Sequence, residues 1–96
     1  MSYSDELEVL TDQAEIFKAL AHPTRIFIVE HLLNREYCVN ELTKMIGVEM
    51  PTVSRHLSVL KNVGIITSRK ESNNIFYRIK LECVKNTLSC ANKMNV

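Results

Sequence analysis

The chain has 96 residues and a formal net charge of +1, and its apolar and charged contents of 46% and 24% are ordinary for a globular protein. It contains no apolar run long enough to span a bilayer, and the acidic start MSYSDELEVL lacks the layout of a signal peptide. We therefore expect a single cytoplasmic domain without a membrane partner, in which the three cysteines are thiols rather than a disulfide framework.

Charge is unevenly distributed along the chain. Residues 1–41 hold eight acidic and three basic side chains, whereas residues 42–80 hold seven basic and two acidic ones. A basic half on a nearly neutral chain is typical of a phosphate-binding face, and chance clustering on a solvated surface gives the same pattern.

Two helices are predicted in the first third of the chain. The first covers residues 5–21, where apolar residues recur in alternating three- and four-residue steps at Leu7, Leu10, Ala14, Phe17 and Ala21. Pro23 suits the first turn of the second helix, because its missing N–H costs nothing there. That helix is apolar over much of its circumference, which predicts a central place in the core.

The next two helices have the spacing of a helix-turn-helix, over residues 39–63. The first of them carries Val39, Leu42 and Ile46 inward and ends at Gly47. The second opens with Pro51, carries Val53, Leu57 and Leu60 inward, and ends at Gly64. Only a few residues, one of them a glycine, separate the pair.

The rest of the chain predicts a hairpin and a last helix. Two β-rich runs, IITSR and NIFYRIK, flank a polar turn in which Asn73 and Asn74 can take left-handed angles. Residues 81–94 again have a helical period. We expect a mainly α fold with a β-hairpin wing at 65–80, in the order α-α-α-α-β-β-α, which is a winged helix-turn-helix.

The second helix of the pair is the candidate DNA-reading element. Its face opposite the apolar stripe presents Pro51, Thr52, Ser54, Arg55 and Ser58. Arg55 can form a bidentate pair with guanine, and the short hydroxyls can bond to phosphates or bases. His56 and the wing residues Arg69 and Lys70 are candidates for phosphate contacts. An ordinary amphipathic surface helix is the competing interpretation.

Three stretches of the sequence resemble one family. They are FKALAHPTRIFIVEHLL, CVNELTKMIGVEMPTVSRHLSVLKNVGIITSRKE and NIFYRI, and together they span about residues 14 to 80. They are similar to the ArsR/SmtB (arsenic-repressor type) family of transcriptional repressors. The resemblance implies a DNA-binding protein rather than an enzyme, with no cofactor required for DNA binding.

The resemblance also implies how such a protein works. A homodimer forms through residues 5–21 and 81–94, and two recognition helices enter successive major grooves of a near-palindromic operator until an inducer releases them. The family's groove-facing positions fall on Met50, Pro51, Ser54 and Arg55. Many members have Gln-Ser where this chain has Met50 and Pro51, so Met50 offers apolar contact to a thymine methyl in place of an amide contact.

Cysteines are the candidate inducer ligands. Arsenic sensors of the family resemble LCVCDL where this chain reads YCVNEL, so Cys38 matches the first cysteine and Asn40 replaces the second. Cys38 also opens a helix-start box with Glu41 three residues later. The family's zinc site is excluded, because Leu81, Cys83 and Met94 occupy three of its ligand positions.

Three thiols, Cys38, Cys83 and Cys90, suit a thiophilic ion such as As(III) or Sb(III). Seven residues of helix rise about 10.5 Å, so Cys83 and Cys90 of one straight helix cannot share one small ion or form a disulfide with each other. Groups from Cys38 or from a partner subunit must converge with them. The alternatives are simple packing of apolar thiols, a redox or persulfide switch, and a ligand-independent protein-interaction module.

Overall fold

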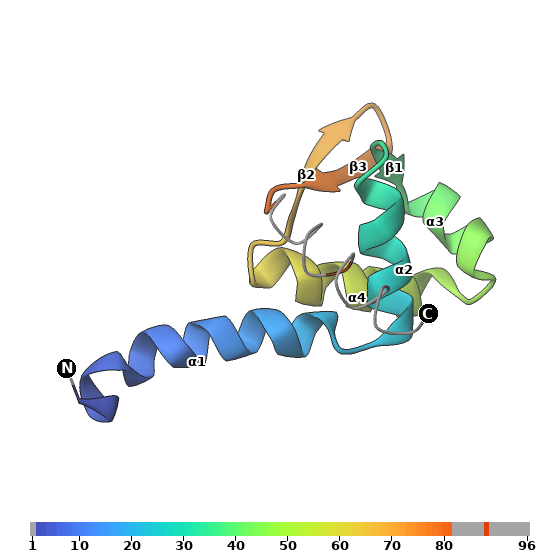
Figure 1. Cartoon of the computed structure of the whole chain (residues 1–96). Helices are drawn as coiled ribbons and strands as arrows, with labels where there is room; N and C mark the ends of the chain where they lie inside the picture. Colours follow the sequence, from blue (N-terminus) through green and yellow to red (C-terminus); the bar gives the residue numbers. More distant parts are fainter. Residues whose placement is uncertain (1, 82–87, 89–96) are drawn as a thin grey trace.

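The structure, a computed structural model, describes residues 2–81 and residue 88 (Figure 1). Within these residues the elements occur in the order α1 (Tyr3–Leu20), α2 (Pro23–Leu32), β1 (Tyr37–Cys38), α3 (Val39–Ile46), α4 (Met50–Asn62), β2 (Ile66–Glu71) and β3 (Asn74–Ile79). This order confirms the predicted winged helix-turn-helix. The helix predicted at 81–94 lies outside the described residues, apart from Leu81 and Leu88, which are partly buried and pack against the core.

α1 begins two residues earlier than predicted and extends away from the rest of the molecule (Figure 1). Ser2 starts it, because its hydroxyl accepts from the Asp5 N–H while the Asp5 carboxylate accepts from the Ser2 N–H, both at 3.4 Å. Every residue from Tyr3 to Glu15 is exposed. Only the end of the helix, at Ala19 and Leu20, is buried against the core.

The core forms where α2, α3 and α4 meet the sheet. Four of the six residues predicted to point inward from the helix-turn-helix are fully buried in it: Leu42, Val53, Leu57 and Leu60. The whole cluster comprises Ala19, Leu20, Ile28, Val29, Leu32, Leu42, Val53, Leu57, Leu60, Ile65 and Ile66. Val39 and Ile46 are half-buried and pack against this cluster. The stripe predicted on each helix of the pair is therefore confirmed.

The turn between α3 and α4 depends on a glycine. Gly47 caps α3 with φ of 80°, in the left-handed region, and its N–H bonds to the Thr43 carbonyl at 2.9 Å. A residue with a Cβ is strained in this conformation. Gly47 therefore stops α3 and lets the chain reach the start of α4 within three residues.

The wing is an antiparallel hairpin joined by the two residues Ser72 and Asn73. Its ladder runs from Ile66 opposite Ile79 to Glu71 opposite Asn74. The left-handed angle that the sequence assigned to Asn73 and Asn74 belongs to Ser72, with φ of 55°. Asn74 instead opens β3, because it pairs with Glu71.

β1 was not predicted. It is a two-residue strand that places Tyr37 opposite Tyr77 and Cys38 opposite Phe76, so that β3 is the middle strand of the order β1-β3-β2. It ties the start of α3 directly to the wing. No helix within residues 2–81 has the length and apolarity needed to cross a membrane.

Candidate nucleic-acid interface

The outer face of α4 is open to solvent around the helix N-terminus. Met50, Pro51, Thr52 and Arg55 are exposed, and Ser54 is half-buried. The N-cap residue is Glu49, which makes no side-chain capping bond. The positive end of the helix dipole and the Arg55 guanidinium therefore act in the same direction on a nearby anion.

His56 is turned toward α2 rather than toward this face. It is half-buried, and its Nδ1 accepts a hydrogen bond from Arg25 Nε at 3.1 Å. Its ring also contacts the His22 ring, with 4.5 Å between centroids. Burial, followed by the charges of His22, Arg25 and Arg55, lowers the pKa of His56. The phosphate contact expected of His56 is thus replaced in this structure by an interhelix contact.

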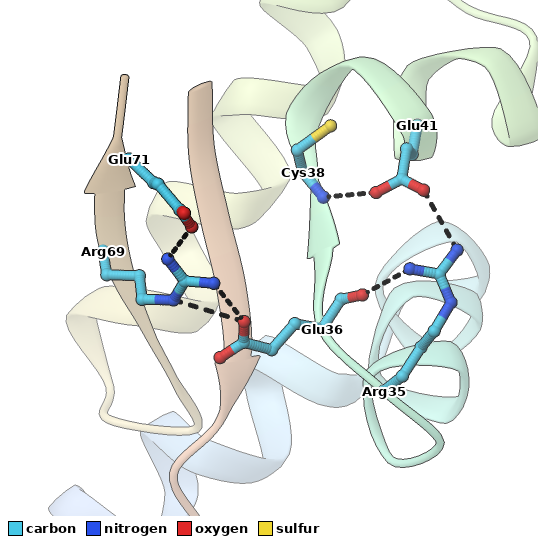
Figure 2. Close-up of polar contacts among 6 residues, drawn as sticks. All are labelled: Arg35, Glu36, Cys38, Glu41, Arg69 and Glu71. Carbon is cyan, nitrogen blue, oxygen red and sulfur yellow. Dashed lines mark hydrogen bonds and ion pairs between the residues drawn. The ribbon is translucent and has the colours of Figure 1, made fainter. Parts of the chain in front are cut away.

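The wing cation Arg69 already has carboxylate partners. Its guanidinium contacts Glu36 Oε1 at 2.8 Å and also pairs with Glu71, and it lies 4.8 Å from the centre of the Phe76 ring (Figure 2). The hydrogen bonds that Arg69 donates to Glu36 and then to Glu71 raise the pKa of Arg69, and the bond with Arg69 lowers the pKa of Glu36. The neighbouring Lys70 is exposed.

Cys38 occupies the N-cap position of α3 and is buried, with 7% of its surface exposed. Glu41 Oε1 accepts from the Cys38 backbone N–H at 3.0 Å, as the helix-start box predicts (Figure 2). This bond, followed by the bond from Arg35, lowers the pKa of Glu41. The Arg35 guanidinium donates hydrogen bonds to the Glu41 carboxylate at 3.0 Å and to the Glu36 carbonyl at 2.7 Å. It therefore links the residues that precede and follow Cys38 in the chain.

Asn40, at the position where arsenic sensors carry their second cysteine, joins α3 to the wing. Its Nδ2 donates to Asn74 Oδ1 at 3.4 Å. Both residues are exposed. The contact adds a second link, besides β1, between the helix-turn-helix and the hairpin.

Whether the three thiols come together is not tested by the described residues. Cys83 and Cys90 lie outside the described residues, and Cys38 is the free cysteine within them. Residues 2–81 and 88 contain no group of three His, Cys, Asp or Glu residues placed to hold a metal ion. A shared thiolate site stays a prediction.

The sequence reasoning missed the contacts that cross between elements. The Arg25–His56 bond joins residues 31 apart, and the Arg69–Glu36 bond joins residues 33 apart. Charge complementarity was the available signal for the second pair, but it does not select one of eleven acidic residues. Only the register of the sheet, which places β1 beside β3, makes that selection.

Known proteins with the same arrangement of elements identify the family. Residues 22–68 match the family model described as "Bacterial regulatory protein, arsR family". A biofilm growth-associated repressor from Xylella fastidiosa is 37% identical over 79 residues, which cover 82% of this chain and 69% of that protein.

Two solved structures extend the similarity to the fold. One is a homodimeric winged helix-turn-helix DNA-binding domain from Mycobacterium bovis, described as a possible ArsR-family regulator, with 28% identity, a TM-score of 0.83 and coverage of 94% of this chain and 83% of that one. The other is reduced HlyU from Vibrio cholerae, with 26% identity, a TM-score of 0.81 and coverage of 94% and 95%. The expectation of a transcription regulator rather than an enzyme is confirmed, and the chain belongs to the arsR family of bacterial regulatory proteins.

Proposed function

We propose that the chain is a cytoplasmic, homodimeric transcriptional repressor that binds a near-palindromic operator and leaves it when an inducer acts on cysteine thiols. The observation that carries the DNA-binding part is the open face of α4. Val53, Leu57 and Leu60 are fully buried, so the helix is held rigidly by one face while the opposite face is presented to solvent. Sequence is read by base-edge contacts from such a face.

Within this face the proposed roles differ. Arg55 pairs with a guanine edge, Met50 contacts a thymine methyl, and Pro51, Thr52 and Ser54 fit the groove wall and phosphates. On the wing, Lys70 is the exposed phosphate-binding cation. Arg69 reaches DNA only by exchanging Glu36 and Glu71 for a phosphate, and in the free protein it stabilises the wing against β1.

The exposed stripe of α1 supports a dimer. Leu7, Leu10 and Phe17 are 43%, 41% and 60% exposed, although their spacing is that of a packed helical face. A self-complementary helix face of this kind fits a two-fold interface, and the similar Mycobacterium bovis domain is described as homodimeric. Two copies then carry two α4 helices to two half-sites.

Placing charge in the stripe tests the dimer. We expect Leu10→Glu with Phe17→Glu to convert the dimer to a monomer in sedimentation velocity and to weaken operator binding at least tenfold. Val9→Glu is the comparison variant, because Val9 is also exposed and lies outside the stripe, about 100° around the helix from Leu10. A double variant that stays dimeric at micromolar concentration would show that α1 does not form the interface.

The inducer acts, in this proposal, on the start of α3. Cys38 is buried at the N-cap, so binding an ion or a modifying group requires the thiol to leave its place between α3 and the sheet. That movement disturbs the Glu41 cap and the β1 pairing. Since α3 packs on α4 and β1 pairs with the wing, both candidate DNA-contacting elements move with it.

Two kinds of inducer fit this position. As(III) or Sb(III) takes three soft ligands, which requires Cys83 and Cys90 from one or both subunits to join Cys38. A redox or persulfide signal requires only two thiols, one that reacts first and a second that pairs with it. The second candidate is favoured by the single cysteine at the α3 start, and a structure similar to this chain is described as reduced HlyU.

Cys38→Ser separates sensing from DNA binding. We expect operator affinity within about threefold of wild type, because serine retains the N-cap geometry, and we expect release by arsenite or by polysulfide to be lost. Gel shift on DNA from upstream of the chain's own gene, with and without each reagent, measures both. The matched variants are Cys83→Ser and Cys90→Ser.

The outcomes divide the alternatives. Loss of arsenite release in all three variants supports a trigonal thiolate site, whereas oxidant-induced cross-links in mass spectrometry support a redox switch. Wild-type DNA affinity that is unchanged by arsenite and by polysulfide removes both. A ligand-independent protein-interaction module predicts no operator complex, or one without the steep salt dependence of phosphate contacts.

A further inference from the structure

Three side chains meet where the start of α2 packs against α4. His22 is the N-cap of α2, and its Nδ1 accepts from the Thr24 N–H at 3.2 Å. Arg25, in the first turn, donates its Nε–H to His56 Nδ1 at 3.1 Å. The two imidazole rings are 4.5 Å apart between centroids and tilted by 53°. This His22–Arg25–His56 cluster joins α2 to the DNA-reading helix.

His56 uses Nδ1 as an acceptor for the Arg25 N–H, which fixes the protonation state of its ring in this arrangement. A ring nitrogen that accepts a hydrogen bond carries no proton, so a proton can occupy Nε2 only and the ring is neutral. Adding a proton to His56 Nδ1 would direct an N–H at the Arg25 N–H and place two positive charges side by side. Protonation of His56 and the Arg25–His56 bond therefore exclude each other.

Within residues 2–81, His56 has no ion pair with a carboxylate. The titratable or charged groups that act on its ring are His22 before α2, Arg25 on α2 and Arg55 on α4, and none of them is acidic. Burial is the largest cause, ahead of these charges, of the lowered pKa of His56. Protonation is thus delayed to lower pH, and it breaks the contact when it occurs.

The position of His56 makes this contact relevant to DNA. It lies between Arg55, which is exposed on the open face, and Leu57, which is fully buried. A contact at this point adds to the packing of Val53 and Leu57 in setting the orientation of the first half of α4, which carries residues 50–55 of the open face.

We propose that Arg25 and His56 are positioning residues for operator binding, and that their contact is a proton-sensitive joint: protonation of His56 breaks it and weakens that binding. The inference rests on the proposed DNA-binding function. Its direction is diagnostic, because a histidine that simply gains charge near DNA strengthens phosphate attraction as pH falls. The joint gives the opposite sign.

Operator binding as a function of pH tests the joint. Fluorescence anisotropy with DNA from upstream of the chain's own gene, at constant ionic strength, compares pH 7.5 with pH 5.5. We expect wild-type affinity to be lower at pH 5.5 than at pH 7.5, and to fall further as the pH approaches the lowered midpoint of His56. His56→Asn keeps an acceptor near the place of Nδ1 but does not titrate, so it should bind within about threefold of wild type at pH 7.5 and lose the pH dependence. Arg25→Ala should bind weakly at both values.

NMR titration of the free protein supplies a readout that does not need DNA. As the pH falls, the amide signals of the first half of α4 should shift with the same midpoint as the His56 ring signals in wild type, and they should not shift in His56→Asn. The signals of His31, at the other end of α2, are followed in the same samples as an internal comparison. Wild-type affinity that holds or rises at pH 5.5, or α4 amides that ignore the His56 midpoint, overturns the joint. Absence of operator binding at every pH refutes the proposed DNA-binding function instead. In that case the NMR titration alone tests whether the Arg25–His56 contact responds to protonation.

Discussion

Leu57→Ala is expected to lower the free energy of unfolding by about 2–5 kcal/mol, the cost of deleting a buried leucine side chain and leaving a cavity. Leu57 has no exposed surface and lies at the middle of α4, among the other fully buried residues of the helix-turn-helix and sheet. The free energy of unfolding of a native domain is typically only about 5–15 kcal/mol, so this loss is a large fraction of it. The variant should therefore unfold at a clearly lower urea concentration.

Urea unfolding followed by circular dichroism, at one fixed protomer concentration, measures this loss. Ser58→Ala is the matched control, because Ser58 is the next residue of α4 and is exposed. Its effect should stay within about 0.5 kcal/mol. A loss below about 1 kcal/mol at Leu57 would mean that α4 is not anchored through this side chain.

The same residue shows why much of the fold follows from the sequence. The apolar stripe of α4 has helical spacing, at Val53, Leu57 and Leu60. An amphipathic helix removes such a stripe from water by packing it against a core. Glycines at 47 and 64 end the two helices in left-handed conformations that other residues avoid. Local rules of this kind decide element order, and they were sufficient for the winged helix-turn-helix.

The candidate site was less predictable, because its contacts depend on register between distant segments. A period of 3.6 residues identifies the faces of α4 but does not say that His56, at the border of two faces, meets Arg25 instead of solvent. Arg69 was expected at the tip of the wing as a DNA contact. In the free protein its side chain pairs with Glu71 and, across β3, with Glu36, the residue before β1. β1 is a two-residue strand, too short to have a sequence pattern that would predict this pairing.

The cysteine site shows a different limit. The helix-start box at Cys38 involves residues only three apart in the sequence, so the bond from the Cys38 N–H to Glu41 could be predicted, and the structure contains it. Whether the three thiols meet depends on the subunit interface. Spacing along one chain says nothing about that interface and only rules out a direct Cys83–Cys90 disulfide within one straight helix. Because Cys38 is buried, the inducer proposed above would have to displace packed structure to reach its thiol.

Arg55→Ala is expected to weaken operator binding without unfolding the protein. The side chain is exposed on the open face of α4, so its removal leaves no cavity and no buried partner, and thermal unfolding should be unchanged within about 2 °C. A bidentate arginine–guanine pair discriminates by about 1–3 kcal/mol, which corresponds to about a 5- to 150-fold loss of affinity.

The specificity of the effect distinguishes base reading from general charge. Lys18→Ala removes an equal exposed charge from the end of α1 and serves as the matched control, for which we expect less than a threefold change. Competition with random-sequence DNA completes the test, because losing a base contact lowers affinity for the operator more than for other sequences, whereas losing a phosphate contact weakens both equally. Equal losses on the two DNAs would reassign Arg55 to the phosphate backbone, and the recognition of sequence would then have to come from Met50, Pro51, Thr52 and Ser54 and from the shape of the operator.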